Sequence, residues 1–303
     1  MWAAREVKVA ELETSFRRAW QRQTSNHPNY GKGSSMTAED WWAEVVHGTF
    51  QPLIGGRHLP AKLCPALFRH FASRDAYGLF PDVEPFFQAM KELRARFRDS
   101  TGPTILTGVI TNSDDRVSSV LKDLGLPVGV VLGPMTERLF DRHGLPKSSI
   151  PKPTVTSAAP VRDATPLAFP ELARWYNPED DINFLITSRA ANCIKPSHEI
   201  FQHGGRLVSG LLASRVLQDP SQGYRGYLKA LQKYVGMSHI HVGDDFVGDY
   251  QGASKLMDTE ALHLCRDISP DDKQDHQISN LSELFTYLNV MANVNLSRET
   301  PDT

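Results

Sequence analysis

Apolar residues in the first 80 or so positions recur with the spacing of amphipathic helices. The segment VKVAELETSFRRAWQRQ places Val9, Leu12, Phe16 and Trp20 on one helical face. A second segment, TAEDWWAEVVHGTF, opens with a threonine three residues before an aspartate. This is a capping-box pattern in which aspartate stands for glutamate. These patterns indicate a helical N-terminal subdomain, and helix packing alone explains its aromatic side chains.

From about residue 85 onward, strand-like apolar runs alternate with amphipathic helical segments. The expected strands are TILTGVIT at 104–111, INFLIT at 182–187, SHIHVG at 238–243 and ALHLC at 261–265. Such alternation predicts an α/β fold with a mostly parallel sheet and helices on both of its faces. Ligands of such sheets bind beyond the carboxyl ends of the strands, so the residues there are the candidate functional residues.

Two stretches interrupt this alternation. Residues 143–180 are rich in proline, serine, threonine and alanine, show no sustained period, and are interpreted as an inserted flexible loop. A second break is expected from 202 to 226, before a helix at 227–236. The division expected from these patterns is as follows: helices in 1–80, an α/β core in 81–142 and 181–294, the loop in 143–180, and a polar tail in 295–303.

Composition and charge exclude several classes of protein. The net charge is −2, which favours binding to neither nucleic acid nor an anionic membrane. No apolar run approaches the ~20 residues that cross a bilayer, and the first residues lack the apolar centre of a signal peptide. The three cysteines are far apart, which is typical of a reducing compartment. We therefore expect a cytoplasmic or nuclear protein.

Polar side chains follow three of the expected strands. Thr111 and Asn112 come at the end of the first strand, where a hydroxyl and the backbone N–H groups of a turn can hold an anionic oxygen. The same residues also suit an ordinary turn. Lys195 follows the second strand and precedes a proline, so it can reach the sheet end as a point charge, although a surface lysine is the commoner case.

The third group, in HVGDDFVGDY, consists of Asp244, Asp245 and Asp249, which follow the expected strand at 238–243. Carboxylates with open water positions match the octahedral oxygen shell of Mg²⁺. An acidic helix start is the alternative, since aspartate also favours a helix N-terminus. Two histidines in the preceding strand, His239 and His241, are interpreted as ordinary sheet positions.

Taken together, VITNSDDR, KPSHEIF and HVGDDFVGDYQGA resemble the second, third and fourth signatures of the haloacid-dehalogenase-like (HAD) hydrolase superfamily. The N-terminal segments SFRRAWQRQ, PNYG and WWAEVV resemble the helical cap of its REG-2-like (HDHD3-type) branch. The resemblance covers residues 5–290 apart from the two breaks. It implies a HAD-like Rossmannoid parallel sheet with an α-helical cap domain.

The resemblance also implies a site and an activity. Thr111 and Asn112 would bind phosphoryl oxygens, and Lys195 would balance their charge. Asp244 would bind Mg²⁺ with support from Asp249, and Asp245 is the less certain ligand. Most of the family hydrolyses phosphomonoesters through an aspartyl-phosphate, with a second aspartate as general acid and base. A minority removes halide from carbon. The expected partner is a small phosphorylated metabolite, and Trp41 and Arg57 are candidate specificity residues.

The first signature of the family, a strand ending in Asp-x-Asp, does not occur anywhere in the 303 residues. By resemblance, that strand is the central one, between the strands that end at Thr111 and Gly243. Each hydrogen bond of such a strand contributes ~0.5–1.5 kcal/mol and each of its buried side chains ~1.5–3 kcal/mol. Their sum is comparable with the free energy of unfolding of a whole domain, ~5–15 kcal/mol. We therefore expect this chain to be inactive and unstable alone, or its sheet to close imperfectly.

Two explanations of this absence compete: an incomplete translation of the gene, which we favour, and a genuine short form. The functional alternatives are an incomplete HAD-type phosphatase and a non-catalytic relative that binds Mg²⁺ and phosphate or a partner. A phosphoryl-accepting receiver domain is disfavoured, because its acids come first in the chain and its lysine last. A Rossmann dehydrogenase is disfavoured because no strand is followed by G-x-G-x-x-G.

Overall fold

The computed structural model describes residues 7–55, 57–97, 104–133, 177, 179–216, 239–257 and 259–288. The chain divides into two compact units. Unit 1 comprises Met1–Gly78, Thr111–Leu126 and Thr187–Ile194, and unit 2 comprises Leu79–Ile110, Pro127–Ile186 and Lys195–Thr303. The last residues of two strands, Thr111 and Thr187, therefore belong to the helical unit.

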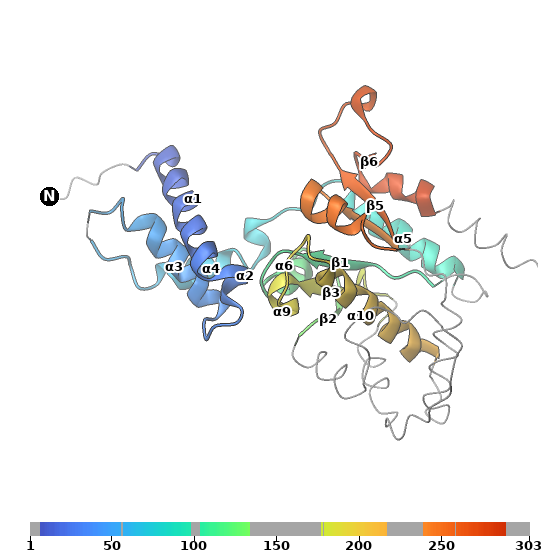
Figure 1. Cartoon of the computed structure of the whole chain (residues 1–303), viewed down its shortest axis with the longest axis horizontal. Helices are drawn as coiled ribbons and strands as arrows, with labels where there is room; N and C mark the ends of the chain where they lie inside the picture. Colours follow the sequence, from blue (N-terminus) through green and yellow to red (C-terminus); the bar gives the residue numbers. More distant parts are fainter. Residues whose placement is uncertain are drawn as a thin grey trace, which may run out of the picture. The chain divides into compact units, whose positions relative to one another are not determined.

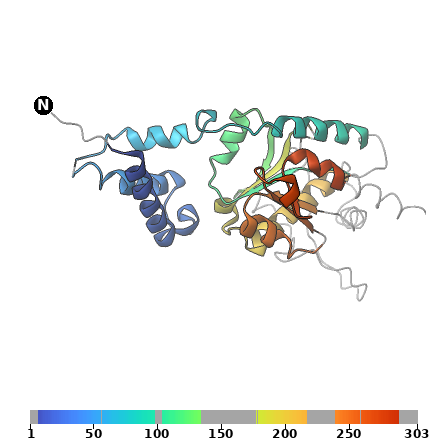
Figure 2. The same cartoon turned by 90° about the horizontal axis from the view of Figure 1, so that it is seen from above.

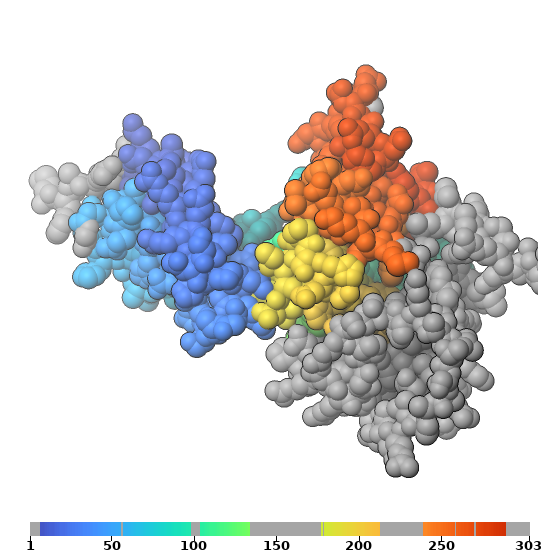
Figure 3. Space-filling model, viewed as in Figure 1, coloured from blue at the N-terminus to red at the C-terminus, as the bar shows by residue number. Residues whose placement is uncertain are grey.

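Unit 1 is helical, as the N-terminal pattern predicts. Its elements are α1 (Val9–Asn26), α2 (Pro28–Gly31), α3 (Ala38–Phe50), α4 (Leu63–His70), the 3-10 turn η1 (Arg74–Ala76), α6 (Val117–Asp123) and α9 (Ser188–Ala191). Helices α1 and α3 lie side by side in both views of the chain (Figures 1 and 2). The space-filling view shows the N-terminal helices, in blue, as a closely packed group (Figure 3).

Aromatic packing holds this unit together. Ala19 from α1 and Trp41 and Val45 from α3 form a buried cluster, against which Trp20 and Trp42 pack. The expected capping box is confirmed: Thr37 accepts a hydrogen bond from the backbone of Asp40, whose carboxylate accepts one in return. Satisfying these donors fixes where α3 begins and thereby which tryptophan points into the core.

Unit 2 contains the strands. The first sheet has β1 (Gly108–Thr111), β2 (Val128–Val131) and β3 (Ile182–Thr187) in the order β1-β3-β2. The second has β4 (His239–Gly243), β5 (Thr259–Leu264) and β6 (Gln277–Ile278) in the order β4-β5-β6. The described ladders β2·β3, β4·β5 and β5·β6 are parallel, with Val128 opposite Ile182 and His239 opposite Thr259. The fold is thus mixed helix and parallel sheet, as predicted.

The described strands form two sheets, and no ladder between β1 and β4 is present within the described ranges. β3 is buried at every position, as a strand covered on both faces requires. β4 is only half-buried along its whole length. The strand β2 was not predicted, although its apolar run VGVV is a strand signal of the same kind.

The helices of unit 2 include α5 (Val83–Phe97) and α10 (His198–Val216), with the π-helical turn η3 (Phe246–Gln251) and the 3-10 turns η4 (Pro270–Asp272) and η5 (Leu281–Glu283). The break expected from 202 to 226 is wrong over 202–216, because α10 runs through it, and residues 217–226 lie outside the described ranges. Gly204 explains the error: a Cβ there would lie 3.1 Å from Ile110 Cδ1, so this glycine allows the helix to approach the sheet closely.

Several expectations fall on residues outside the described ranges. Of the inserted loop at 143–180, only residues 177, 179 and 180 are described, and the helix expected at 227–236 and the tail at 295–303 lie outside altogether. None of the described helices is both long and apolar enough to cross a membrane.

Candidate functional site

A buried ion pair lies at the centre of the candidate site in unit 2. Lys195, in the turn before α10, places Nζ 2.5 Å from Oδ1 of Asp249, a residue of η3. His241 on β4 places Nε2 2.8 Å from the same oxygen. Asp249 is 3% exposed, and the Lys195 side chain is 10% exposed. The structure therefore brings together two of the predicted site residues and adds a histidine.

The backbone around Asp249 is shaped to accept its carboxylate. Gly243 ends β4 without a side chain, and a Cβ at that position would lie 2.1 Å from Cγ of Asp249. The backbone N–H of Asp245 donates to the second carboxylate oxygen, Oδ2, at 3.3 Å. Both oxygens of this buried group are thus satisfied, as burial of a charge requires.

The environment keeps Asp249 ionised. Burial raises the pKa of its carboxyl, but the hydrogen bonds and positive charge of His241 and Lys195 outweigh burial and hold the pKa below its usual range. At neutral pH the carboxylate therefore anchors the Lys195 ammonium at a fixed place beside the end of β4.

The other two acids of the predicted group have different environments. Asp245 is the N-cap of η3: its Oδ1 accepts hydrogen bonds from the backbone N–H groups of Val247 and Gly248, at 3.0 Å each. Asp244 is exposed, and its carbonyl oxygen lies 3.1 Å from Nε2 of His263.

The side chains of these three acids do not point to a common metal position. Among the described residues, no three histidine, cysteine or acidic side chains are grouped so that they could hold a metal ion. Asp249 is held by Lys195 and Oδ1 of Asp245 by its own turn, while Asp244 and Asp245 are both exposed and can present a carboxylate oxygen to a cation. The residues described here therefore do not by themselves complete the Mg²⁺ site that the resemblance implies.

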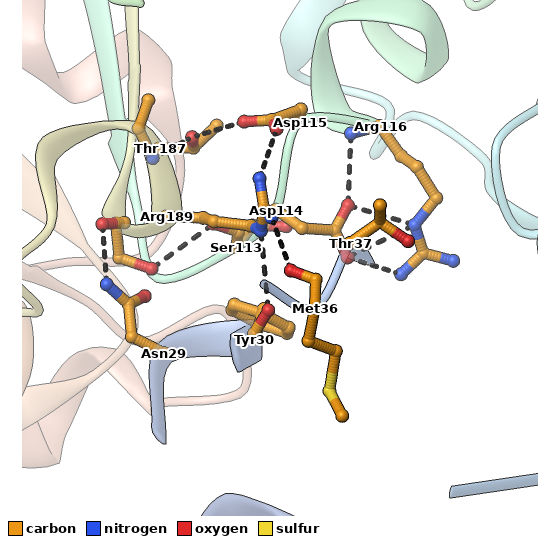
Figure 4. Close-up of polar contacts among 12 residues, drawn as sticks. Asn29, Tyr30, Met36, Thr37, Ser113, Asp114, Asp115, Arg116, Thr187 and Arg189 are labelled. Carbon is orange, nitrogen blue, oxygen red and sulfur yellow. Dashed lines mark hydrogen bonds and ion pairs between the residues drawn. The ribbon is translucent and has the colours of Figure 1, made fainter. Parts of the chain in front are cut away.

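The remaining predicted residues, Thr111 and Asn112, belong to unit 1. The backbone N–H of Ser113 donates to the carbonyl oxygen of Thr111 at 3.0 Å, which closes a tight turn directly after β1. The carbonyl oxygen of Asn112 accepts a hydrogen bond from the hydroxyl of Tyr30 at 3.0 Å. Thus α2 meets the turn to which the sequence assigns anion binding (Figure 4).

A second buried ion pair follows this turn. Asp114 is fully buried and accepts hydrogen bonds from Nε and Nη2 of Arg116 and from Nε1 of Trp42 on α3. The Arg116 guanidinium stacks over the rings of Trp42 and Phe68, at 4.6 and 4.8 Å from their centroids. Burial raises the pKa of the Asp114 carboxyl. The hydrogen bonds from Arg116 and Trp42 and the positive charge of Arg116 lower it by more, so the pKa lies below its usual range.

Sequence reasoning missed His241, Tyr30 and the Asp114–Arg116 pair as members of these clusters. His241 stood in a strand beside the predicted acids, but period-two spacing alone does not show which histidine faces a carboxylate. The adjacent acids of VITNSDDR look equivalent in the sequence, and only burial distinguishes Asp114 from Asp115, whose side chain is 60% exposed.

Comparisons with known proteins found relatives of low sequence identity. No family model matches the chain. An uncharacterised hydrolase of Schizosaccharomyces pombe is 27% identical over 118 residues, which cover 39% of this chain and 46% of the relative. The haloacid dehalogenase-like hydrolase domain-containing protein 3 of Homo sapiens is 29% identical over 82% of this chain and 64% of its own length. The same-named protein of Mus musculus is 22% identical over 94% of this chain and 82% of its own length.

The extent of these matches is uneven. The chain spans about half the length of the fission-yeast relative and less than two thirds of the human one. The similarity is low throughout, and it runs through both compact units in the longest alignment, which covers 295 residues.

Proposed function

Because the chain belongs to the haloacid dehalogenase-like hydrolases, in the branch of hydrolase domain-containing protein 3, we propose that its site serves Mg²⁺-dependent hydrolysis of phosphomonoesters. The observation that carries this proposal is the Lys195 ammonium held beside the end of β4 by the buried Asp249. A cation anchored in this way can neutralise a phosphoryl oxygen without reorganising.

Each predicted residue has a role in the proposal. Lys195 balances the charge of the phosphoryl group, while Asp249 and His241 fix the position of its ammonium. Thr111, with the N–H groups of its turn, holds a phosphoryl oxygen, and Asn112 belongs to the same turn. When bound, Mg²⁺ would neutralise charge on the phosphoryl oxygens.

Among the acids, Asp244 supplies the accessible carboxylate for Mg²⁺. Asp249 and Asp245 support it from the surrounding turn rather than as free ligands. The substrate class is a small phosphorylated metabolite, in the cytoplasm or nucleus, with neither nucleic acid nor a membrane as partner.

The attacking group is the part of this chemistry that the 303 residues do not contain. No Asp-x-Asp occurs in them, so neither a nucleophile nor a general acid is available at the family position. We propose that this chain by itself binds phosphate and does not turn over an ester. A non-catalytic role in binding Mg²⁺ and phosphate is the second candidate function, and the same absence favours it.

The sheet pattern supports a related proposal, that one parallel strand belongs between β1 and β4. Both lie at the edge of their described sheet, and joining them through one strand would give a single sheet with the order β2-β3-β1-strand-β4-β5-β6. Parallel sheets are ordinarily large and covered on both faces, whereas β4 is half-buried throughout.

Calorimetric titration of the purified chain with inorganic phosphate in the presence of Mg²⁺ tests the proposed site. We expect saturable binding that Lys195→Met weakens at least tenfold and that Asp244→Asn renders independent of Mg²⁺. Lys255→Met is the matched control, because Lys255 is an exposed lysine just after η3. Equal phosphate affinity in the Lys195 and Lys255 variants would contradict the proposed role of Lys195.

A further inference from the structure

The short element α2 has an unusual backbone. Asn29 (φ 49°, ψ 50°), Tyr30 (φ 57°, ψ 35°) and Gly31 (φ 74°) are consecutive and all lie in the left-handed region. Glycine adopts this conformation freely, but for other residues it costs roughly 1–2 kcal/mol each, least for asparagine. A left-handed tyrosine therefore persists only where its surroundings hold it, and such strain concentrates at functional sites.

Two loops hold this turn, and each follows a strand of the first sheet. The Tyr30 hydroxyl donates to the carbonyl oxygen of Asn112, after β1, at 3.0 Å. The Asn29 side-chain amide donates to the carbonyl oxygen of Ser188, after β3, at 2.8 Å. Figure 4 shows the Asn29 side chain with its hydrogen bond, and Tyr30 beside the loop that contains Ser113 and Asp114.

Arg189 ties the two loops to the backbone of the same region. Its Nε donates to the carbonyl oxygen of Tyr30 at 3.3 Å, and its Nη2 donates to that of Met36 at 3.2 Å. Its Nη1 forms an ion pair with Asp115, at 2.9 Å. Its backbone N–H also donates to the carbonyl oxygen of Ser113, at 3.2 Å. The turn and the two loops are therefore one hydrogen-bonded assembly inside unit 1 (Figure 4).

We infer that the left-handed turn at Asn29 and Tyr30 is a positioning element, which sets the orientation of the anion-binding turn at Thr111 and Asn112. This inference rests on the proposed function, because it deepens the role given to that turn. Tyr30 acts through the peptide group and touches no reacting atom, so it is a positioning residue rather than a catalytic one.

The planarity of the peptide bond explains how a hydroxyl can do this. The carbonyl of Asn112 and the N–H of Ser113 belong to one peptide group and point in opposite directions. Directing that carbonyl at Tyr30 therefore fixes the direction of the Ser113 N–H, which donates to the carbonyl oxygen of Thr111. One hydroxyl thus sets the tilt of the peptide that closes the turn.

The Tyr30 hydroxyl is suited to permanent donation. Burial, followed by the nearby charge of Asp114, raises the pKa of Tyr30 to about 12, although Arg116 opposes this rise. The phenol is consequently protonated, and able to donate, over the whole range in which the protein would bind an anion. The chain thereby maintains a hydrogen bond that stabilises a costly backbone conformation.

The alternative is that these bonds only hold unit 1 together. Tyr30→Phe removes the hydroxyl and keeps the ring, and Tyr77→Phe is a matched control. The Tyr77 hydroxyl also donates to a backbone carbonyl in unit 1, that of Phe71 at 3.4 Å, rather than to a carbonyl of the anion-binding turn. Both variants and the wild type are titrated with inorganic phosphate and Mg²⁺, at a temperature where circular dichroism shows all three to be folded.

We expect Tyr30→Phe to weaken phosphate binding about 5-fold to 10-fold, the loss typical of one hydrogen bond, and Tyr77→Phe to leave it unchanged. In amide spectra, Tyr30→Phe shifts the Asn112 and Ser113 resonances in the absence of phosphate, and Tyr77→Phe does not. Unchanged phosphate affinity in Tyr30→Phe, with only a lower unfolding midpoint, overturns the inference while wild-type binding still supports the proposed function. A wild type that binds no phosphate overturns both.

Discussion

Replacing Asp114 by asparagine tests the importance of the buried ion pair in unit 1. Its carboxylate accepts hydrogen bonds from the backbone N–H, Nε and Nη2 of Arg116 and from Nε1 of Trp42, at 2.7–3.0 Å. The Arg116 side chain is only 13% exposed, so water replaces the lost acceptor poorly. An asparagine offers one acceptor oxygen and turns an N–H₂ group toward the remaining donors.

The expected loss follows from these contacts. Removing one partner of a buried pair leaves an uncompensated charge and costs about 3–5 kcal/mol. This is a large share of the ~5–15 kcal/mol that stabilises a typical domain. Asp115→Asn is the matched control, because Asp115 is the adjacent acid and also pairs with an arginine, Arg189. Its side chain is 60% exposed, so we expect its loss to cost no more than about 1 kcal/mol.

Urea unfolding measures this difference. Circular dichroism at 222 nm follows the helices, and the fluorescence of Trp20 and Trp41 reports on unit 1 in particular. We expect Asp114→Asn to lower the midpoint far more than Asp115→Asn does, with unchanged slopes. Equal effects of the two substitutions, or a larger effect of Asp115→Asn, would refute the reasoning that burial decides the strength of these pairs.

Three further predictions concern stability and the candidate site. The pKa of Asp114 is lower in the folded state than its unfolded-state value of ~3.9, and this difference stabilises unit 1. The stabilisation is complete above the unfolded-state pKa and is lost as the pH falls through the folded-state pKa. Acid unfolding of Asp114→Asn should therefore lack this part of the transition. Gly243→Ala should destabilise the chain by roughly 1–3 kcal/mol, because the new Cβ displaces Asp249, whereas Gly205→Ala in α10 meets no atom within 4 Å and should be neutral or stabilising in the same thermal melts. In a double-mutant cycle, Lys195→Met and Asp249→Asn should couple by about 0.5–3 kcal/mol, and additive unfolding energies would show that the pair contributes nothing.

Periodicity predicted most of the fold, because it depends on local sequence. The helices α1 and α3, the capping box at Thr37 and the buried strand at 182–187 follow from side-chain spacing. The face expected on α1 is correct only in part, because Val9 and Phe16 are exposed. The prediction of a break in the helix failed where a glycine has a role in tertiary packing. Gly204 looked like a helix breaker, but it lets α10 approach Ile110, and no local pattern contains that information.

The candidate site was harder to predict than the fold. Motif spacing identified Lys195 and Asp249, which the structure joins, but it grouped three aspartates that have different environments: Asp249 pairs with Lys195, Asp245 caps its own turn, and Asp244 is exposed. Whether a carboxylate is free depends on which donors surround it in space, as Asp245 and its own turn illustrate. The left-handed turn at Tyr30 could not be foreseen, because only packing against distant loops stabilises that backbone.

The central claim is that this chain holds a phosphate-binding site without the carboxylate that attacks phosphorus. Release of phosphate from p-nitrophenyl phosphate by the purified chain with Mg²⁺, measured beside Asp244→Asn, tests it most directly. We expect no release above the protein-free blank from either protein, under conditions in which calorimetry shows that the wild type binds phosphate. Mg²⁺-dependent hydrolysis by the wild type that Asp244→Asn abolishes would contradict the claim.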